Sequence, residues 1–265
     1  MAPRDTLLGV DFDGRPVDDP YDVVDEGLDD PRHRDRVPGL VALVHDAAAP
    51  ELDRFVACIA LVTWGEAAGY EAVVAAAAEP RKTAWYDCSI DRKFSVDNTF
   101  AQLARAMTFD LSEEKGTQAA RTEAVRALVR IADSEYFDEQ LEWAVESCVE
   151  EPGVLGDVED AVRRGVLRLS GDTRAIGFDL ATQLVDLACA VAVADPRRAM
   201  RLAAEVLFVA PSDRALKHAE AIAARADGPD RELFATHLQN VRNALHSFLT
   251  IRQNTEQNTD RMTTA

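Results

Sequence analysis

The sequence has little positive charge. It contains 29 Lys and Arg residues against 47 Asp and Glu residues, which gives a net charge of −18. A surface of this sign repels phosphate backbones and anionic membrane surfaces, and it attracts cationic partners. We therefore expect neither nucleic acid nor a membrane as the partner, and we expect a basic protein if the chain binds a macromolecule.

Cysteine is sparse, and no two cysteines lie close together in the sequence. None of the four forms a Cys-x-x-Cys pair of the kind that binds metals or cycles between redox states. A free cysteine in an apolar helix usually behaves as a small hydrophobic residue, so we expect a reducing cytoplasm. The cysteines are Cys58, Cys88, Cys148 and Cys189.

Long apolar runs are also missing. The N-terminal residues lack the apolar stretch of a secretory signal. The most apolar segment, 175–194, contains Asp179, Gln183 and Asp186 at a spacing that places them on one side of a helix. We expect this helix to pack against other helices and not to cross a membrane.

Sequence motifs for catalysis and metal binding are nearly absent. There is no His-Glu-x-x-His, no Gly-x-Ser-x-Gly and no glycine-rich phosphate loop, and the five histidines form no ligand pair. We therefore expect no metal, no cofactor and no enzymatic activity. One partial match lies at 9–16, GVDFDGRP, where Asp11, Asp13 and Gly14 resemble the first motif of haloacid dehalogenase-type phosphatases but Arg15 replaces the usual Thr.

That phosphatase chemistry requires a parallel sheet to carry the aspartates, and no segment downstream alternates strands with helices. The competing interpretation is an acidic arm with an Asp-Gly turn. Between 19 and 250, apolar residues instead recur every three or four positions, which predicts helices. The expected helices span 20–29, 36–48, 51–64, 66–79, 97–110, 113–133, 136–150, 154–169, 173–194, 196–209, 212–226 and 230–250.

Pro, Gly and Asp break these segments at short intervals, so neighbouring helices should be antiparallel. Two of the helices share a pattern in which an arginine is followed by small residues and a leucine at the same offsets. The two sets are Arg54, Ala57, Ala60, Leu61 and Gly65, and Arg121, Ala124, Ala127, Leu128 and Ala132.

This pattern resembles the first helix of HEAT-like (armadillo-type) repeats. The resemblance implies an all-α fold of antiparallel helical hairpins stacked as an α-solenoid; a non-repeating helical bundle is the alternative. We divide the chain into an acidic N-terminal arm (1–18), a helical repeat domain (19–250) and a flexible tail (251–265). The repeat domain has possible sub-lobes at 19–152 and 153–250, and an irregular insertion at 81–98.

Two segments are candidate partner-binding surfaces. The helix at 136–150 carries a column of acids, which in a HEAT-like stack would line the concave binding face. Alternatively these acids are solvated, or they pair with Arg126 or Arg130 on the preceding helix. The column is Asp138, Glu142, Glu146 and Glu150, with Glu139 and Trp143 beside it.

The insertion supplies the second candidate through its aromatic and basic residues, Trp85, Tyr86, Arg92 and Phe94. These aromatic residues either form an exposed recognition cluster or pin the loop to the body of the protein.

The favoured function is a non-enzymatic protein-binding module. The resemblance implies a scaffold, a regulator, or an immunity or inhibitor protein, and the negative charge favours an immunity or inhibitor protein for a basic partner. The resemblance also allows a HEAT-like DNA glycosylase, which would need arginines clustered along a basic groove. A phosphatase that uses the segment around Asp11 is the third and least favoured alternative.

Overall fold

The computed structural model describes residues 3–109, 111–137 and 139–263. The protein is all-α, as predicted. Its first helices are α1 (Pro3–Leu7), α2 (Pro20–Glu26), α3 (Val37–His45), α4 (Glu51–Thr63), α5 (Ala67–Ala78), α6 (Thr99–Ala106) and α7 (Ser112–Lys115). The others are α8 (Gln118–Arg130), α9 (Gln140–Glu146), α10 (Val154–Leu169), α11 (Leu180–Val191), α12 (Pro196–Val209), α13 (Asp213–Arg225) and α14 (Gly228–Thr263).

Short elements complete the fold. Three 3-10 helices occupy Pro31–Asp35, Pro80–Lys82 and Thr173–Ala175. The strands β1 (Ile90–Asp91) and β2 (Val96–Asp97) pair in antiparallel fashion inside the segment expected to be an irregular insertion. The insertion is therefore a small ordered hairpin.

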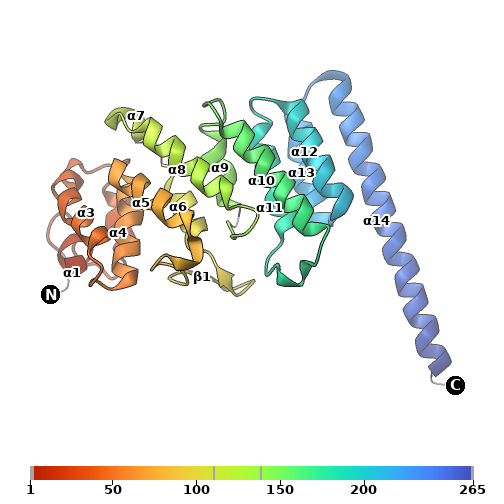
Figure 1. The fold of residues 1–265 in the computed structure, drawn as a ribbon, viewed down its shortest axis with the longest axis horizontal. Helices are drawn as coiled ribbons and strands as arrows, with labels where there is room; N and C mark the ends of the chain where they lie inside the picture. Colours follow the sequence, from red (N-terminus) through yellow and green to blue (C-terminus); the bar gives the residue numbers. More distant parts are fainter. Residues whose placement is uncertain (1–2, 110, 138, 264–265) are drawn as a thin grey trace.

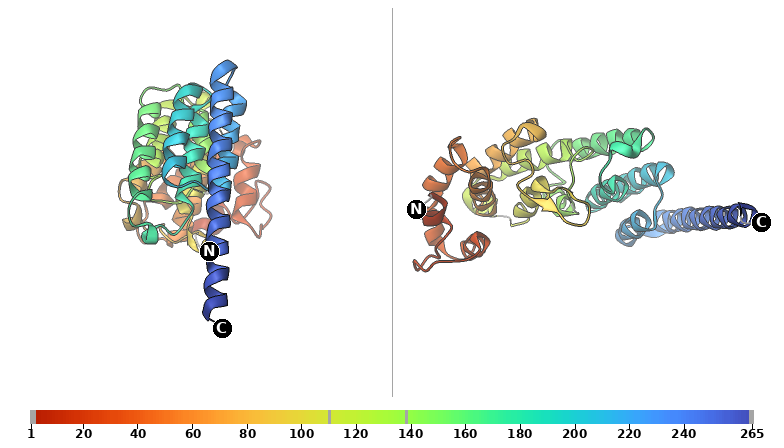
Figure 2. Two further views of the ribbon diagram at one scale, coloured as in Figure 1. Left: turned by 90° about the vertical axis from the view of Figure 1, so that its right-hand side faces the viewer. Right: turned by 90° about the horizontal axis from the view of Figure 1, so that it is seen from below.

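The helices follow one another along an elongated molecule, from α1 at one end to α14 at the other (Figures 1 and 2). Contacts between helices fall into two series. In one, α3, α5, α8, α10 and α12 each pack against the next, and in the other α2, α4, α6, α9, α11 and α13 do so. Helices that are adjacent in sequence, such as α4 with α5 and α11 with α12, join the two series.

The ends of the helices follow from local chemistry. The side chains of Asp19, Asp195 and Ser212 accept backbone N–H groups at the starts of α2, α12 and α13, which satisfies donors that the first turn of a helix leaves free. Gly116, with φ of 67°, ends α7 and separates it from α8. A left-handed residue cannot continue a helix, so the single helix predicted at 113–133 is two.

The helices α4 and α8 carry the arginine-led pattern, and its small residues and leucines are buried in both. They do not occupy equivalent positions, however. Helix α4 packs against α6, whereas α8 packs against α5 and α10, in the other series. The shared spacing therefore reports burial against a neighbour, and it does not identify two copies of the same repeat helix.

Helix α11 is buried along its whole length, and hydrogen bonds hold the polar side chains of its cap residue and of Gln183. Asp179 caps its first turn by accepting from the Thr182 N–H at 3.1 Å. The Gln183 amide donates to the Ala132 carbonyl at 2.6 Å and accepts from the Phe137 N–H at 2.8 Å. Asp179 and Gln183 are thus paired inside the protein, whereas Asp186, the third polar residue of the stripe, has one carboxylate oxygen without a hydrogen-bond partner among the described residues. Within the described residues, no helix is both apolar enough and long enough to cross a bilayer.

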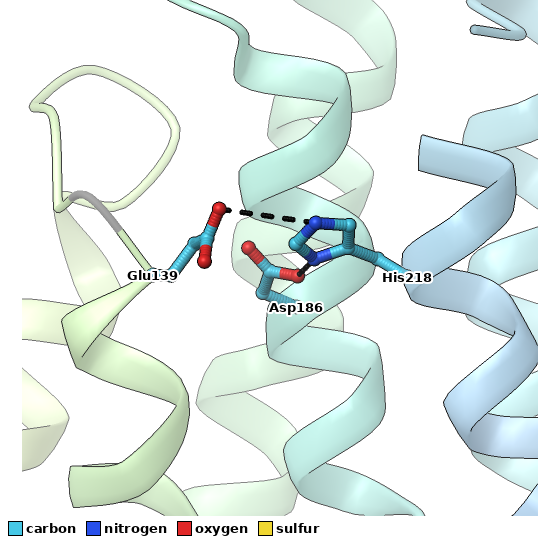
Figure 3. A group of neighbouring side chains, drawn as sticks. All are labelled: Glu139, Asp186 and His218. Atoms are coloured by element: carbon cyan, nitrogen blue, oxygen red, sulfur yellow. Dashed lines mark hydrogen bonds and ion pairs between the residues drawn. The ribbon is translucent and has the colours of Figure 1, made fainter. Parts of the chain in front are cut away.

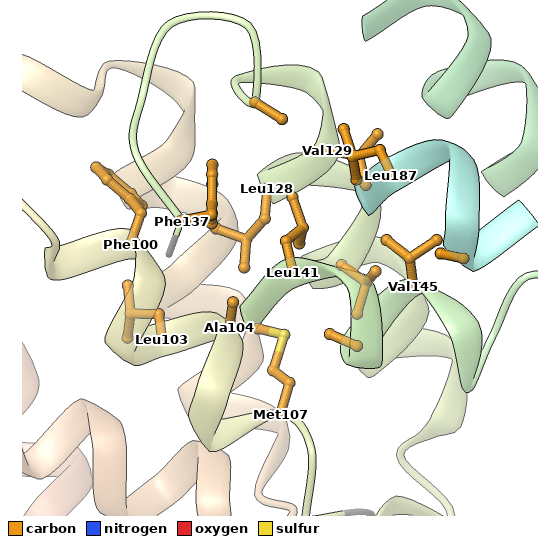
Figure 4. Close-up of a cluster of buried hydrophobic side chains, with 14 of the residues drawn as sticks. Phe100, Leu103, Ala104, Met107, Leu128, Val129, Phe137, Leu141, Val145 and Leu187 are labelled. Carbon is orange, nitrogen blue, oxygen red and sulfur yellow. The ribbon is translucent and has the colours of Figure 1, made fainter. Parts of the chain in front are cut away.

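A single hydrophobic core runs through the molecule. Figure 4 shows its central part, where Leu103 of α6, Leu128 of α8, Leu141 of α9 and Leu187 of α11 converge. Helices α8 and α9 lie before residue 152, while α10 and α11 follow it, and the two pairs pack together. The proposed sub-lobes 19–152 and 153–250 therefore share one core.

Both ends of the chain contain helical structure. In the N-terminal arm, the Arg36 guanidinium donates to the carbonyls of Leu7, Val10 and Asp11 at 2.7, 2.8 and 2.6 Å, and it lies over the Phe12 ring. The arm is thus fixed against α3. At the other end, α14 continues as a helix to Thr263, through the tail that was predicted to be flexible.

Candidate functional site

The aromatic insertion is pinned to the core by Trp85. This side chain is only 4% exposed, and its ring centroid lies 6.3 Å from that of Phe55 on α4. The Thr99 hydroxyl donates to the Trp85 carbonyl at 3.1 Å. An exposed cluster that includes Trp85 was the wrong expectation, because burying a large aromatic ring stabilises the fold more than leaving it in water does.

The other two aromatic residues of the insertion are also held against the body of the protein. Phe94 packs edge-on against Tyr136, with centroids 5.7 Å apart, and the Tyr86 hydroxyl donates to Glu135 at 3.3 Å. Of the predicted residues in this segment, only Arg92 is exposed. The insertion therefore does not present its aromatic residues as a recognition surface.

Tyr86 instead lines a cavity of about 230 Å³ together with Arg81, Asp97, Glu135 and Arg168. Burial is the main cause that raises the pKa of both Asp97 and Glu135. The carboxyl groups are matched by the two guanidinium groups, so this cavity has no preference for a ligand of either charge.

The acidic column on α9 is only partly available to a partner. Asp138 lies outside the described residues. Glu139 pairs with Arg214, and Glu146 pairs with Arg225 at 3.1 Å. Both arginines belong to α13, which the sequence places far from α9. Within the predicted set, Glu150 and Trp143, the latter 63% exposed, are the residues that face solvent.

The arginines of the preceding helix do not fill the pairing role that we considered for them. Arg126 and Arg130 of α8 both form salt bridges to Glu123 and Asp157. The expectation that Glu142 is exposed was also wrong, because its carboxyl is half-buried between α9 and the helices packed on it. Burial and the nearby Asp186 carboxylate raise the pKa of Glu142 to about 7.

Glu142 lies beside a compact cluster formed by Glu139, Asp186 and His218 (Figure 3). Asp186 on α11 is 2% exposed, and its Oδ1 lies 2.5 Å from His218 Nδ1 on α13. Glu139 Oε1 lies 3.8 Å from His218 Nε2, on the other side of the ring. Burial raises the pKa of Asp186 to about 6, opposed by the neighbouring imidazole.

The backbone places Glu139 in this cluster. Glu139 directly precedes α9 and has φ of 66°, in the left-handed region that few residues other than glycine adopt. The Gln183 side chain on α11 anchors the segment just before it through the Phe137 N–H. Sequence spacing does not predict this cluster, because its members come from α11, α13 and the residue before α9.

A second site lies nearer the N-terminal end of the molecule (Figure 1). A groove of about 400 Å³ is bounded by Tyr21 and Asp25 of α2 on one side and by Arg105 of α6 with the nearby Phe109 on the other. Thr63 of α4 forms part of its floor. The Thr63 side chain is 2% exposed.

The surface next to this groove is strongly acidic. The acids of α2 and its flanks are exposed, and those named here form no salt bridge with any residue that the structure describes. They are Asp18, Asp22, Asp25 and Asp29. Tyr21 stands among them; burial, followed by the Asp19 carboxylate, raises the pKa of its hydroxyl. Our choice of acidic surface from the sequence overlooked this run, although 18–30 is among the most acid-rich parts of the chain.

Comparison with known proteins adds no assignment. The chain matches no protein-family model, no curated protein and no solved structure. Its site is interpreted from geometry and charge.

The segment that resembles a phosphatase motif forms a turn. Asp11 Oδ1 accepts from the backbone N–H groups of Asp13 at 2.9 Å and Arg15 at 2.7 Å, and Gly14 has φ of 82°. The Arg15 N–H is the largest cause that lowers the pKa of Asp11. In the described parts of the chain, the strand that follows the arm belongs to a two-stranded antiparallel hairpin, so the aspartates lack the parallel sheet that this chemistry requires.

Proposed function

We propose that the protein is a non-enzymatic, HEAT-like stack of helical hairpins that binds a basic protein segment in the groove between α2 and α6. Two series of helices, linked by pairs adjacent in sequence, support the stacked-hairpin interpretation. The exposed, unpaired acids of α2 carry the binding proposal, because opposite charge speeds association and selects the partner.

The groove suits a basic side chain flanked by backbone. Asp25 supplies a carboxylate on one wall, and Tyr21 and Phe109 supply aromatic faces against which a guanidinium or an alkyl chain packs. Arg105, on the opposite wall, is a donor for a carbonyl or carboxylate of the same segment. Thr63 completes the floor with a hydroxyl that can donate or accept.

The distribution of arginine favours a protein over nucleic acid. Arginines gather on α8, α10 and α12, but each of them has a carboxylate partner, so they offer phosphates little unpaired charge. They are Arg126, Arg130, Arg163, Arg164, Arg168, Arg197, Arg198 and Arg201. The HEAT-like resemblance allows both an inhibitor or immunity role and a glycosylase, and the acidic charge favours the inhibitor or immunity role toward a basic protein.

The test begins with affinity capture at low salt from a lysate of the organism, followed by affinity measurement with the purified partner. The variant Asp22→Lys/Asp25→Lys should weaken binding at least about tenfold, as loss of roughly 1.4 kcal/mol implies. The charge-matched control Asp227→Lys/Glu232→Lys reverses exposed acids at the start of α14, at the other end of the molecule (Figure 1), and should change the affinity less than about twofold.

Tyr21→Ala distinguishes contact inside the groove from overall electrostatic attraction, because it alters the groove wall without changing the net charge. It should weaken binding while the salt dependence of association stays as in the wild type. Equal losses in the α2 variant and the control would show that the acids act only through overall charge. Unchanged affinity in both groove variants would place the partner elsewhere.

A further inference from the structure

We propose that Glu139, Asp186 and His218 form a binding site for a divalent transition metal such as Zn²⁺. The donor set is two carboxylates and one imidazole, which zinc and its neighbours accept, with water completing the coordination. The inference is independent of the α2 groove, which is formed by other helices.

The positions of the donor atoms favour an ion. One ligand atom from each residue lies within 4.8 Å of those of the other two. Asp186 Oδ2 is buried and has no hydrogen-bond partner among the described residues, and Figure 3 shows this second oxygen pointing into the space beside Glu139. A buried carboxylate oxygen without a donor is costly, and a metal ion would satisfy it.

The Asp186 contact also orients the imidazole. With a proton on Nδ1, His218 donates to Asp186 Oδ1 at 2.5 Å, which leaves the Nε2 lone pair directed toward Glu139. Nε2 and Glu139 Oε1 are 3.8 Å apart, too far for a hydrogen bond. Two ligands that are each about 2.0 to 2.1 Å from one zinc ion are separated by about this distance at a wide coordination angle.

Charge balance points the same way. Carboxyl groups around the cluster outnumber guanidinium groups, which favours a bound cation over an anion. The carboxyl groups are those of Glu139, Glu142, Glu146, Asp179 and Asp186, and the guanidinium groups are those of Arg214 and Arg225. Arg214 now contacts Glu139, and on metal binding it would keep Asp179, 3.8 Å away, as its partner.

The experiment is equilibrium dialysis of the full chain against Zn²⁺ at pH 7.5, after treatment with a chelator. The wild type should retain one equivalent of zinc, and His218→Ala should weaken its affinity at least tenfold. His237→Ala removes an exposed histidine on α14 and Cys88→Ser removes the partly exposed thiol; both should bind as the wild type does.

Glu139→Gln is a second variant that should remain folded, because Glu139 is partly exposed and can be changed without opening the core. It should weaken zinc binding while the circular-dichroism spectrum stays unchanged. With Co²⁺ in place of Zn²⁺, the visible absorption of a four- or five-coordinate site should appear in the wild type and disappear in His218→Ala. Absence of stoichiometric zinc in the wild type, or equal affinity in a folded Glu139→Gln or His218→Ala variant, would overturn the proposal.

Discussion

Trp85 and Trp143 show how far the role of one residue type depends on its neighbours. Trp85 is buried against Phe55, whereas Trp143 projects from α9 into solvent. Trp85→Ala should lower the free energy of unfolding by about 3 to 5 kcal/mol, because it leaves a large cavity beneath the insertion. Trp143→Ala should change it by less than about 0.5 kcal/mol. Urea denaturation of the two variants provides the comparison, and equal losses would contradict the burial of Trp85.

Glu142 makes stability depend on pH. Its folded-state pKa is raised from 4.5 to about 7, so the stability associated with its bound proton is present below pH 4.5 and is lost as pH rises through 7. Glu142→Gln should therefore stabilise the protein at pH 8, by on the order of 1 to 2 kcal/mol after allowance for solvent screening. At pH 4 the variant and the wild type should be close.

The control for Glu142 is Glu150→Gln, an exposed carboxyl on the same segment. It should leave the pH profile of the wild type unchanged. Melting temperatures measured from pH 4 to 8 with a chelator present decide the matter, and a Glu142→Gln profile parallel to that of the wild type would contradict the prediction.

At the residue scale, the sequence shows which residues are acidic but does not show which basic residues pair with them. The acids of 136–150 are visible as a column, yet Glu139 and Glu146 are neutralised by Arg214 and Arg225, which lie on a distant segment. No local spacing encodes such a contact, since it depends on how α13 packs against α9. The exposed acids of α2 could have been found from charge density alone.

Glycines in the helices report how closely these elements approach. A Cβ added at Gly69 of α5 would lie 2.7 Å from the Val62 nitrogen and 2.8 Å from the Leu61 carbonyl carbon on α4, and backbone cannot move aside easily. At Gly156 of α10, a Cβ would meet no atom within 4 Å.

Gly69→Ala should therefore destabilise the protein by about 1 to 3 kcal/mol through overpacking. Gly156→Ala should stabilise it by about 0.5 to 1 kcal/mol, because alanine loses less conformational entropy in a helix than glycine does. Thermal or urea unfolding of both variants checks the pair. If both substitutions destabilised the protein, the expected gain from helix propensity at Gly156 would be contradicted.

The bounds of individual helices were the most predictable feature of the structure. The ranges 154–169 and 196–209 were predicted at the bounds that α10 and α12 have, because Gly153 and Pro196 fix where the helices start. Helix α9 is much shorter than the predicted 136–150. Its first predicted turn is held by Gln183 of α11, and such a tertiary hydrogen bond overrides local helix propensity.

The molecule as a whole should unfold as one unit, because its core continues across residue 152. Leu103→Ala in α6 and Leu202→Ala in α12 remove side chains that are fully buried at distant points of the chain. Each should lower the same transition temperature, with a loss of about 2 to 5 kcal/mol. Scanning calorimetry should give equal calorimetric and van't Hoff enthalpies. Two transitions, each affected by one substitution only, would establish separate lobes.

The arrangement of the whole could be predicted only in outline. Helical period and short connections predict an all-α chain of successive helices, which the structure has (Figure 1). The assignment of α4 and α8 to different series could not be predicted, since both bury the same pattern of alanine and leucine. Burial against any neighbour selects these residues, so their spacing does not specify which neighbour.

The left-handed backbone of Glu139 has a consequence for evolution. A residue other than glycine at φ of 66° carries a strain on the order of 1 to 3 kcal/mol. In the proposed metal site, this strain accompanies the placement of a carboxylate beside His218. A variant library sorted for resistance to protease should therefore enrich glycine or asparagine at this position, and a library sorted for zinc binding should retain glutamate.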